Sequence, residues 1–210
     1  MNIRMLGFII YPLMKCSGTL GAEGYFHETT PYAPNSPYSA SKASSDFIVR
    51  SYHKTYGMNT VISNCSNNYG PHQHKEKLIP TIIRKAIAGE SIPIYGDGSN
   101  VRDWLYVEDH CRAIDRIFHQ GATGETYNVG GKNEISNLEI AGIICKKLDE
   151  IKNRSGEKSF QSQIQFVTDR LGHDHRYAID CTKIEKELNW TPEVHFEQGI
   201  DRTIQWYLEK

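Results

Sequence analysis

The sequence predicts a soluble globular protein with an α/β fold, and three observations support that prediction. Short segments rich in β-branched residues alternate with longer segments of helical periodicity along the chain. Hydrophobic residues make up 39% of the 210 residues, which is enough to build one sizeable core. The formal net charge is −1, so the composition argues against a general nucleic-acid binder, which would carry an excess of Lys and Arg.

The best-defined element is a helix predicted over residues 37–56. Ser36 is a favourable N-cap, Pro37 suits the first helical turn, and Gly57 is a typical C-terminal stop. The other expected helices cover 78–88, 108–119, 136–151, 181–188 and 195–208, and the expected strands cover 60–65, 91–95, 101–107, 126–129, 164–167 and 175–179. Polar segments at 25–37, 71–77, 152–163 and 168–173 are expected to be loops.

An apolar run extends from Met5 to Met14 near the start of the chain. The run is too short to span a bilayer. Lys15 follows it and no small-residue cleavage site comes next, so export and membrane insertion are disfavoured and a cytoplasmic location is expected.

The cysteines and histidines do not suggest a metal site or a disulfide framework. The five cysteines are odd in number and form no CxxC pair, which favours reduced, buried thiols. Two His-x-His pairs, His72/His74 and His173/His175, lack a carboxylate or thiol at a familiar spacing. We therefore expect no bound metal.

Tyr38 and Lys42 stand four residues apart on the predicted helix over 37–56, and this spacing places them on one face. An ammonium beside a phenol favours the phenolate, which could accept a proton from a sugar hydroxyl. The lysine could also bind the ribose hydroxyls of a dinucleotide. By itself the spacing is also compatible with an ordinary surface pair.

Several other polar residues are candidates for binding a nucleotide sugar. Arg102 offers a planar cationic fork suited to a diphosphate, and Lys77 could contact the same group. The amides of Asn67, Asn68 and Asn137 can each donate and accept. Each residue also has a simpler interpretation, as a solvated cation or a turn residue. The loop that carries Asp169, Arg170 and His173 is equally compatible with a surface ion pair.

A series of motifs carries a family resemblance. The string Pro37-Tyr38-Ser39-Ala40-Ser41-Lys42 resembles the active-site helix of extended short-chain dehydrogenase/reductases. Later motifs follow in the expected order, and the series is similar to the dTDP-glucose 4,6-dehydratases from Gly18 to Lys210. These motifs are Asn64-Cys65-Ser66-Asn67-Asn68-Tyr69-Gly70-Pro71, Glu76-Lys77-Leu78-Ile79-Pro80, Pro93-Ile94-Tyr95-Gly96, Arg102-Asp103-Trp104-Leu105-Tyr106-Val107, Tyr127-Asn128-Val129-Gly130-Gly131 and Asp169-Arg170-Leu171-Gly172-His173-Asp174.

The resemblance implies the C-terminal part of an NAD(P)-binding Rossmann fold with a small interleaved substrate-binding lobe. Residues 18–70 and 95–121 would belong to the Rossmann domain, 71–94 and 122–190 to the lobe, and 191–210 to a C-terminal helix. Tyr38 and Lys42 would be catalytic and, with Asn68, would contact NAD. The dTDP-sugar would meet Asn67, Lys77, Leu78, Pro93, Ile94, Tyr95, Arg102, Asn137, Asp169, Arg170, Gly172 and His173.

The implied reaction converts dTDP-glucose to the 4-keto-6-deoxy sugar with loss of water, in the biosynthesis of cell-surface polysaccharide. The family that this chain resembles forms dimers packed through helices that include the tyrosine helix. The resemblance therefore implies a homodimer. The alternatives are a related nucleotide-sugar epimerase or decarboxylase, and a non-catalytic nucleotide-sugar binding protein that docks with a full-length paralogue.

Residues 1–17 depart from the family pattern. The family carries S-T-D-E-V-Y-G here, where aspartate and glutamate carry out the dehydration, whereas this chain reads Pro12-Leu13-Met14-Lys15-Cys16-Ser17-Gly18. Asp-Glu codons read one base out of frame give Met-Lys, so we expect a frameshift in this segment and an impaired activity. The pattern Gly18-x-x-Gly21-x-x-Gly24 is not expected to be a dinucleotide fingerprint, because no helix is predicted after it.

Overall fold

A computed structural model describes residues 5–9, 18, 20–21, 23–169 and 175–210. Its central element is a parallel sheet of order β1-β2-β6, formed by β1 (Met5–Ile9), β2 (Thr60–Cys65) and β6 (Thr126–Val129). The proposed frameshift segment Tyr11–Cys16 and the candidate residues Arg170, Gly172 and His173 lie outside the described residues.

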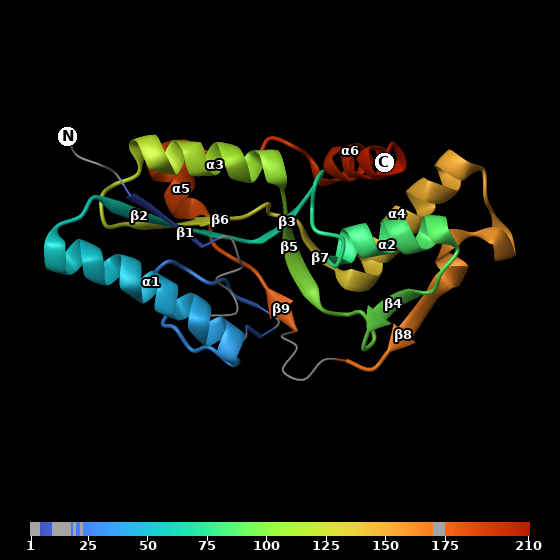
Figure 1. The fold of residues 1–210 in the computed structure, drawn as a ribbon, viewed down its shortest axis with the longest axis horizontal. Helices are drawn as coiled ribbons and strands as arrows, with labels where there is room; N and C mark the ends of the chain where they lie inside the picture. Colours follow the sequence, from blue (N-terminus) through green and yellow to red (C-terminus); the bar gives the residue numbers. More distant parts are fainter. Residues whose placement is uncertain (1–4, 10–17, 19, 22, 170–174) are drawn as a thin grey trace.

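Two helices cover this sheet on opposite sides (Figure 1). Both α1 (Pro37–Tyr56) and α3 (Val107–Gln120) contact β2. Every residue of β2 is buried, as expected of a parallel strand with both faces covered. The layered order helix, sheet, helix confirms the predicted α/β class.

Helix α1 begins and ends where the sequence predicts. The Ser36 side chain accepts a hydrogen bond from the Ser39 amide at 3.1 Å, and Gly57 adopts a left-handed φ of 64° at the C-cap. Ser39, Ala43 and Asp46 form the buried face of the helix. The caps therefore fix where Tyr38 lies relative to the start of the helix.

A second group of strands surrounds β5 (Val101–Tyr106). It pairs in parallel with β3 (Asn67–Tyr69) and β9 (Arg176–Tyr177) and antiparallel with β7 (Glu134–Ser136). Neither β3 nor β7 was predicted, because each has only three residues and depends on β5 for its hydrogen bonds.

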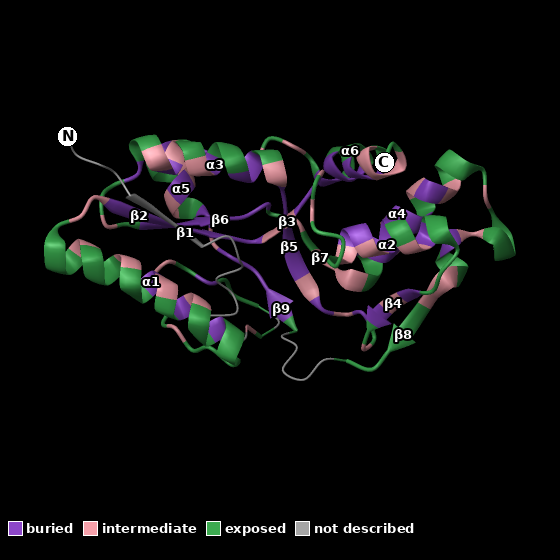
Figure 2. Ribbon diagram, viewed as in Figure 1, coloured by how far each residue is buried: buried purple, intermediate pink, exposed green. Residues whose placement is uncertain are grey.

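The other half of the molecule is built on three helices and a two-stranded parallel sheet. Figure 2 shows buried segments on α2 (Leu78–Ala88), α4 (Asn137–Lys152) and α6 (Phe196–Leu208), and these helices supply much of one hydrophobic core. The strands β4 (Ile92–Tyr95) and β8 (Ile164–Val167) flank that core.

Two elements within residues 122–190, the segment assigned to the lobe, lie in or beside the first sheet, and the division into domains stays a prediction. Strand β6 pairs with β2 in the first sheet, and α5 (Thr182–Leu188) packs with α3 and β6 in a second core. The apolar side chains of β6 and α5 are the physical reason, because they complete the core beside the parallel sheet.

The segment 152–163, expected to be an irregular loop, contains two short 3₁₀ turns, Gly156–Lys158 and Phe160–Gln163. Phe160 is buried against α4, and its backbone amide donates to Asp149 at 2.9 Å. The Arg154 guanidinium lies 4.0 Å from the Phe160 ring centroid. A single apolar residue therefore orders a stretch that looks polar in the sequence.

Two other expectations can be compared with the described residues. Cys65, Cys145 and Cys181 are buried free thiols, but Cys111 is exposed on α3, which corrects the expectation of uniformly buried cysteines. The glycine pattern ending at Gly24 leads into an isolated bridge at Phe26 and then a turn, not into a helix. Within the described part of the chain, no helix combines the length and apolar character needed to cross a membrane.

Candidate active site

Tyr38 and Lys42 lie on the first turns of α1. The Lys42 ammonium is 5.6 Å from the centroid of the Tyr38 ring, and 44% of Tyr38 is exposed. The predicted pair is therefore a real pair in space, and its tyrosine is open to a ligand.

Asp46 continues the same stripe of α1 one turn after Lys42. The Tyr32 hydroxyl donates to Asp46 Oδ2 at 2.6 Å, while Oδ1 is buried without a hydrogen-bond partner among the described residues. Burial raises the pKa of Asp46 to about 6, although the Tyr32 hydrogen bond and Arg50 act in the opposite direction. This contact anchors the loop before α1 to the helix that carries the tyrosine.

Buried amides gather where β2 and β6 end. Asn64 and Asn128 are register partners on these strands, and both are almost fully buried. Neither polar atom of the Asn64 amide has a hydrogen-bond partner among the described residues, and the same holds for Asn128 Oδ1. Open α/β sheets bind ligands at the carboxyl ends of their strands, so this is the expected place for unpaired polar groups.

Asn67 and Asn68 follow directly on β3. Asn68 Nδ2 donates to Cys65 Sγ at 3.2 Å, which fixes the orientation of the amide. Its Oδ1 atom is buried and has no partner in the described part of the chain. Asn67 is half-buried and lies opposite Trp104 of β5. An acceptor held ready in this way suits a ligand that carries an N–H group.

A second group of candidates meets near the end of β4. Tyr95 is exposed, and a Cβ placed on the following Gly96 would lie 3.1 Å from Asp169 Oδ2. The backbone N–H of Asn137, the first residue of α4, donates to the backbone carbonyl of Asn100 at 3.1 Å. The structure therefore places Asp169 against Gly96, the residue that follows Tyr95.

Arg102 lies on β5 beside β9. Its guanidinium donates to Val101 O at 2.7 Å and His175 O at 3.1 Å, and it lies 4.3 Å from the Tyr177 ring centroid. The residue is buried, so the cation is oriented by fixed contacts. This differs from the solvated strand-edge arginine that the sequence left open.

The remaining candidates lie around the start of α2 and along β4. Lys77 is the exposed N-cap residue of α2, Leu78 is its half-buried first residue, Pro93 is half-buried and Ile94 is buried. Ile94 contributes to the hydrophobic core beside α2, so its role includes packing.

Asp103 is an important residue that the sequence reasoning did not single out. Its carboxylate accepts hydrogen bonds from the Gly131 amide at 2.8 Å and the Asn133 amide at 2.7 Å. Burial raises the pKa of Asp103. The contact ties β5 to the loop after β6. The Arg-Asp-Trp and Gly-Gly strings were both visible in the sequence, but nothing local shows that they meet.

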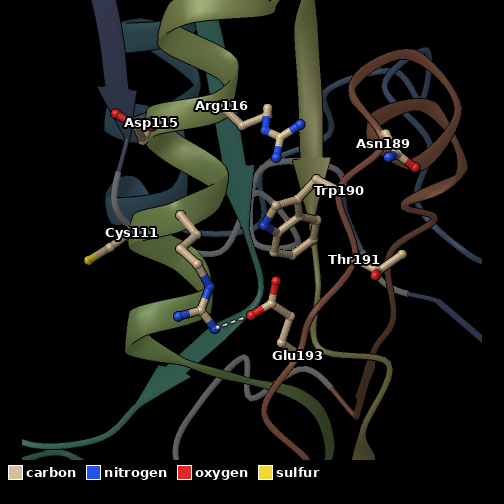
Figure 3. Close-up of a pocket in the computed structure, with 8 residues that line it drawn as sticks. Cys111, Asp115, Arg116, Asn189, Trp190, Thr191 and Glu193 are labelled. Carbon is tan, nitrogen blue, oxygen red and sulfur yellow. Dashed lines mark ion pairs between the residues drawn. The ribbon is translucent and has the colours of Figure 1, made fainter.

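Two surface pockets lie away from the predicted site residues. The larger, of about 480 Å³, lies between α3 and the segment before α6 (Figure 3). Arg112 of α3 forms an ion pair there with Glu193 at 3.5 Å. The smaller, of about 310 Å³, lies beside Asp103 and Cys181. Neither is lined by a residue of the predicted site.

The sequence profile of the GDP-mannose 4,6 dehydratase family matches residues 16–203. The chain belongs to this family. Among curated members, a dTDP-glucose 4,6-dehydratase of Xanthomonas campestris pv. campestris is 59% identical over 91% of this chain and 54% of its own length. The dTDP-glucose 4,6-dehydratase 1 of Escherichia coli K12 is 56% identical over 87% of this chain and 50% of its own length. The chain thus spans about half the length of these relatives.

Solved structures of family members share the fold. A dTDP-glucose 4,6-dehydratase of Bacillus anthracis in complex with NAD superposes with a TM-score of 0.85 at 47% identity, over 94% of this chain and 60% of that one. The Streptomyces venezuelae enzyme DesIV, solved with NAD and TYD bound, gives a TM-score of 0.84 at 44% identity, over 93% of this chain and 57% of that one. The α/β architecture therefore matches the Rossmann-type fold of these NAD-containing enzymes, as predicted.

Proposed function

We propose that this chain supplies two parts of a dTDP-glucose 4,6-dehydratase: the helix with the catalytic tyrosine and the residues that bind the nucleotide sugar. The observation that carries the proposal is the pairing of Tyr38 with Lys42 on α1, in a fold whose β2 and β6 carry buried amides. The oxygen atoms of these amides lack a hydrogen-bond partner among the described residues. Tyr95, Arg102 and Asp169 would bind the nucleotide end of the substrate.

The residues present fit the nicotinamide end of NAD. Asn68 Oδ1 is a buried acceptor that lacks a partner among the described residues, and a carboxamide N–H could donate to it. Lys42 would hold the ribose hydroxyls. When bound, NAD supplies a hydride acceptor for oxidation of the sugar.

The chain's own groups act on protons and on orientation. Tyr38 Oη would take the proton of the C4 hydroxyl as that carbon is oxidised, and the Lys42 charge would favour the phenolate. Arg102 and Lys77 would hold the diphosphate, with Arg102 preset by its contacts to Val101 and His175. Asn67, Leu78, Pro93, Ile94, Tyr95, Asn137 and Asp169 would surround the rest of the nucleotide sugar, together with Arg170, Gly172 and His173.

Elimination of water from C5 and C6 needs an acid and a base as well. Residues 12–18 contain no Asp or Glu, so the chain offers no carboxylate at the positions where the family carries them. We therefore expect the 210-residue chain alone not to dehydrate dTDP-glucose, since loss of one general acid or base typically costs about 10²- to 10⁴-fold in rate.

A joined protein tests the proposal. The N-terminal half of the E. coli relative, through the segment that corresponds to the family's S-T-D-E-V-Y pattern, is fused to residues 18–210 of this chain. Incubation with dTDP-glucose should yield a product lighter by one water, detected by mass spectrometry. A soluble, folded fusion that binds dTDP-glucose but forms no product would contradict the dehydratase proposal and favour a binding protein. Inversion at C4 without loss of water would favour an epimerase.

We also propose a homodimer through α1. Phe47, Ile48, Tyr52 and Tyr56 are exposed along this helix, an unusual density of large apolar side chains for a solvated surface. A second copy of the chain would cover this face.

A further inference from the structure

The last turn of α6 contacts the loop that follows β3. The Tyr207 hydroxyl donates to the backbone carbonyl of Gln73 at 2.7 Å. The neighbouring Trp206 ring lies 4.6 Å, centroid to centroid, from the His72 imidazole. His72 has a φ of 62°, in the left-handed region that costs a residue with a Cβ about 1–2 kcal/mol. The loop conformation therefore depends on contacts from outside the loop.

Gln73 passes this contact on to Asn68. Its Nε2 donates to the backbone carbonyl of Asn68 at 2.6 Å. The side chain of Asn68 is held at its other end by Cys65 Sγ, and its Oδ1 has no partner among the described residues. Two hydrogen bonds thus link Tyr207 to Asn68 through Gln73: one to the backbone carbonyl of Gln73 and one from its side chain.

Helix α6, which carries Tyr207, is itself held in place at its N-terminal end. The Tyr69 hydroxyl donates to the carbonyl of Phe196, the first residue of α6, at 3.3 Å. The buried carboxylate of Asp109 accepts the amides of Glu193 and Val194, both at 3.0 Å, just before α6. These contacts fix the N-terminal end of α6, and Ile200 and Ile204 are buried along the helix, so Tyr207 is carried by a well-packed element.

We propose that Gln73 and Tyr207 are positioning residues that hold Asn68 in the orientation needed to accept a hydrogen bond from the cofactor. The identity of the ligand rests on the proposed function, whereas the hydrogen-bond chain does not. Neither residue touches substrate or cofactor in this proposal. Both act through the backbone of the loop over residues 68–73.

Hydrogen–deuterium exchange on the 210-residue chain tests the structural part without any ligand. Tyr207→Phe removes one donor and Gln73→Met removes the other, and each should speed exchange in peptides covering 66–74 by about two- to ten-fold, the loss of one hydrogen bond. The matched control is Gln161→Met, at a residue that is exposed elsewhere and belongs to no proposed site. Unchanged exchange in 66–74, or an equal rise across all peptides, would overturn the proposal.

The joined protein tests the functional part. In Tyr207→Phe and Gln73→Met the Kd for NAD, measured by titration, should rise about two- to ten-fold. The kcat at saturating NAD should stay within about twofold, because no reacting group has changed. A fall in kcat with an unchanged Kd would overturn the proposal. If the fusion is inactive, the exchange and NAD titration results still decide the positioning role, so its failure and that of the dehydratase proposal are distinguishable.

Discussion

Asn64 of β2 and Asn128 of β6 are register partners at the carboxyl end of the parallel sheet, and both side chains are buried. Asn128 Nδ2 donates to Phe26 O at 3.2 Å, whereas both polar atoms of the Asn64 amide lack a partner among the described residues. Such an arrangement costs stability and is typical of a position reserved for a ligand.

Asn64→Leu should therefore stabilise the isolated chain. An unpaired buried polar group costs about 1–3 kcal/mol, and leucine has a similar shape without polar atoms. Asn128→Leu is the comparison, because it also breaks the bond to Phe26 and should stabilise less. Urea unfolding of both variants measures the difference. A loss of stability in Asn64→Leu would show that its amide is satisfied in solution.

Gly131→Ala should be strongly destabilising, since an added Cβ would overlap the carbonyl oxygen of Trp104. The clash also disturbs the Gly131 amide that Asp103 accepts. We expect a loss of about 2–4 kcal/mol, within the range of severe packing and buried hydrogen-bond defects. Gly142→Ala is the control. It lies within α4 with open space around it and should gain about 0.5–1 kcal/mol. Equal melting temperatures for the two variants would contradict this packing.

Asp46→Asn should change how stability depends on pH. Burial raises the pKa of Asp46 from 3.8 to about 6 in the folded chain. Between these values the unfolded state has lost its proton while the folded state keeps it, so Asp46 lowers stability as pH rises through this window. Asparagine still accepts from Tyr32 but does not titrate.

The stability of Asp46→Asn relative to the parent chain should therefore increase from pH 4 to pH 7, by at most about 3 kcal/mol. Burial also lowers the pKa of His110 to about 4, but His110 is present in both proteins and cancels in the difference. Chemical denaturation at several pH values provides the comparison, and a difference that stays constant with pH would contradict a raised pKa for Asp46.

Ile48→Glu should convert the proposed dimer to a monomer. The charge would lie on the exposed apolar face of α1 and would have to be buried in the interface. Ile87→Glu, on α2, places the same charge on another exposed isoleucine and should leave the mass unchanged. Light scattering coupled to size-exclusion chromatography measures the mass of both variants. A monomeric parent chain, or dissociation by both variants, would contradict an interface on α1.

The parts that could be predicted from the sequence are those set by local interactions. Ser36 and Gly57 define α1, and helical spacing then brings Tyr38 and Lys42 together. The strands β3 and β7 could not be predicted in this way, because three residues carry little pattern and their partner β5 is distant in the sequence.

The same distinction applies to the binding residues. The charge of Arg102 suggested a diphosphate ligand, but its contacts with His175 and Tyr177 depend on the pairing of β5 with β9. The approach of Asp169 to Gly96 depends on the pairing of β4 with β8. The roles of Asp103, Gln73 and Tyr207 rest on contacts with residues remote along the chain, so composition and spacing could not reveal them.

The most direct test of the central claim is Tyr38→Phe in the joined protein. Removing the phenolic oxygen should lower kcat for loss of water from dTDP-glucose by about 10²- to 10⁴-fold, because the C4 hydroxyl loses its proton acceptor. The Kd for dTDP-glucose should stay within about twofold. Tyr56→Phe, on the same helix, should keep full activity. Near-normal turnover in Tyr38→Phe would contradict the assignment of this tyrosine as the group that accepts the proton.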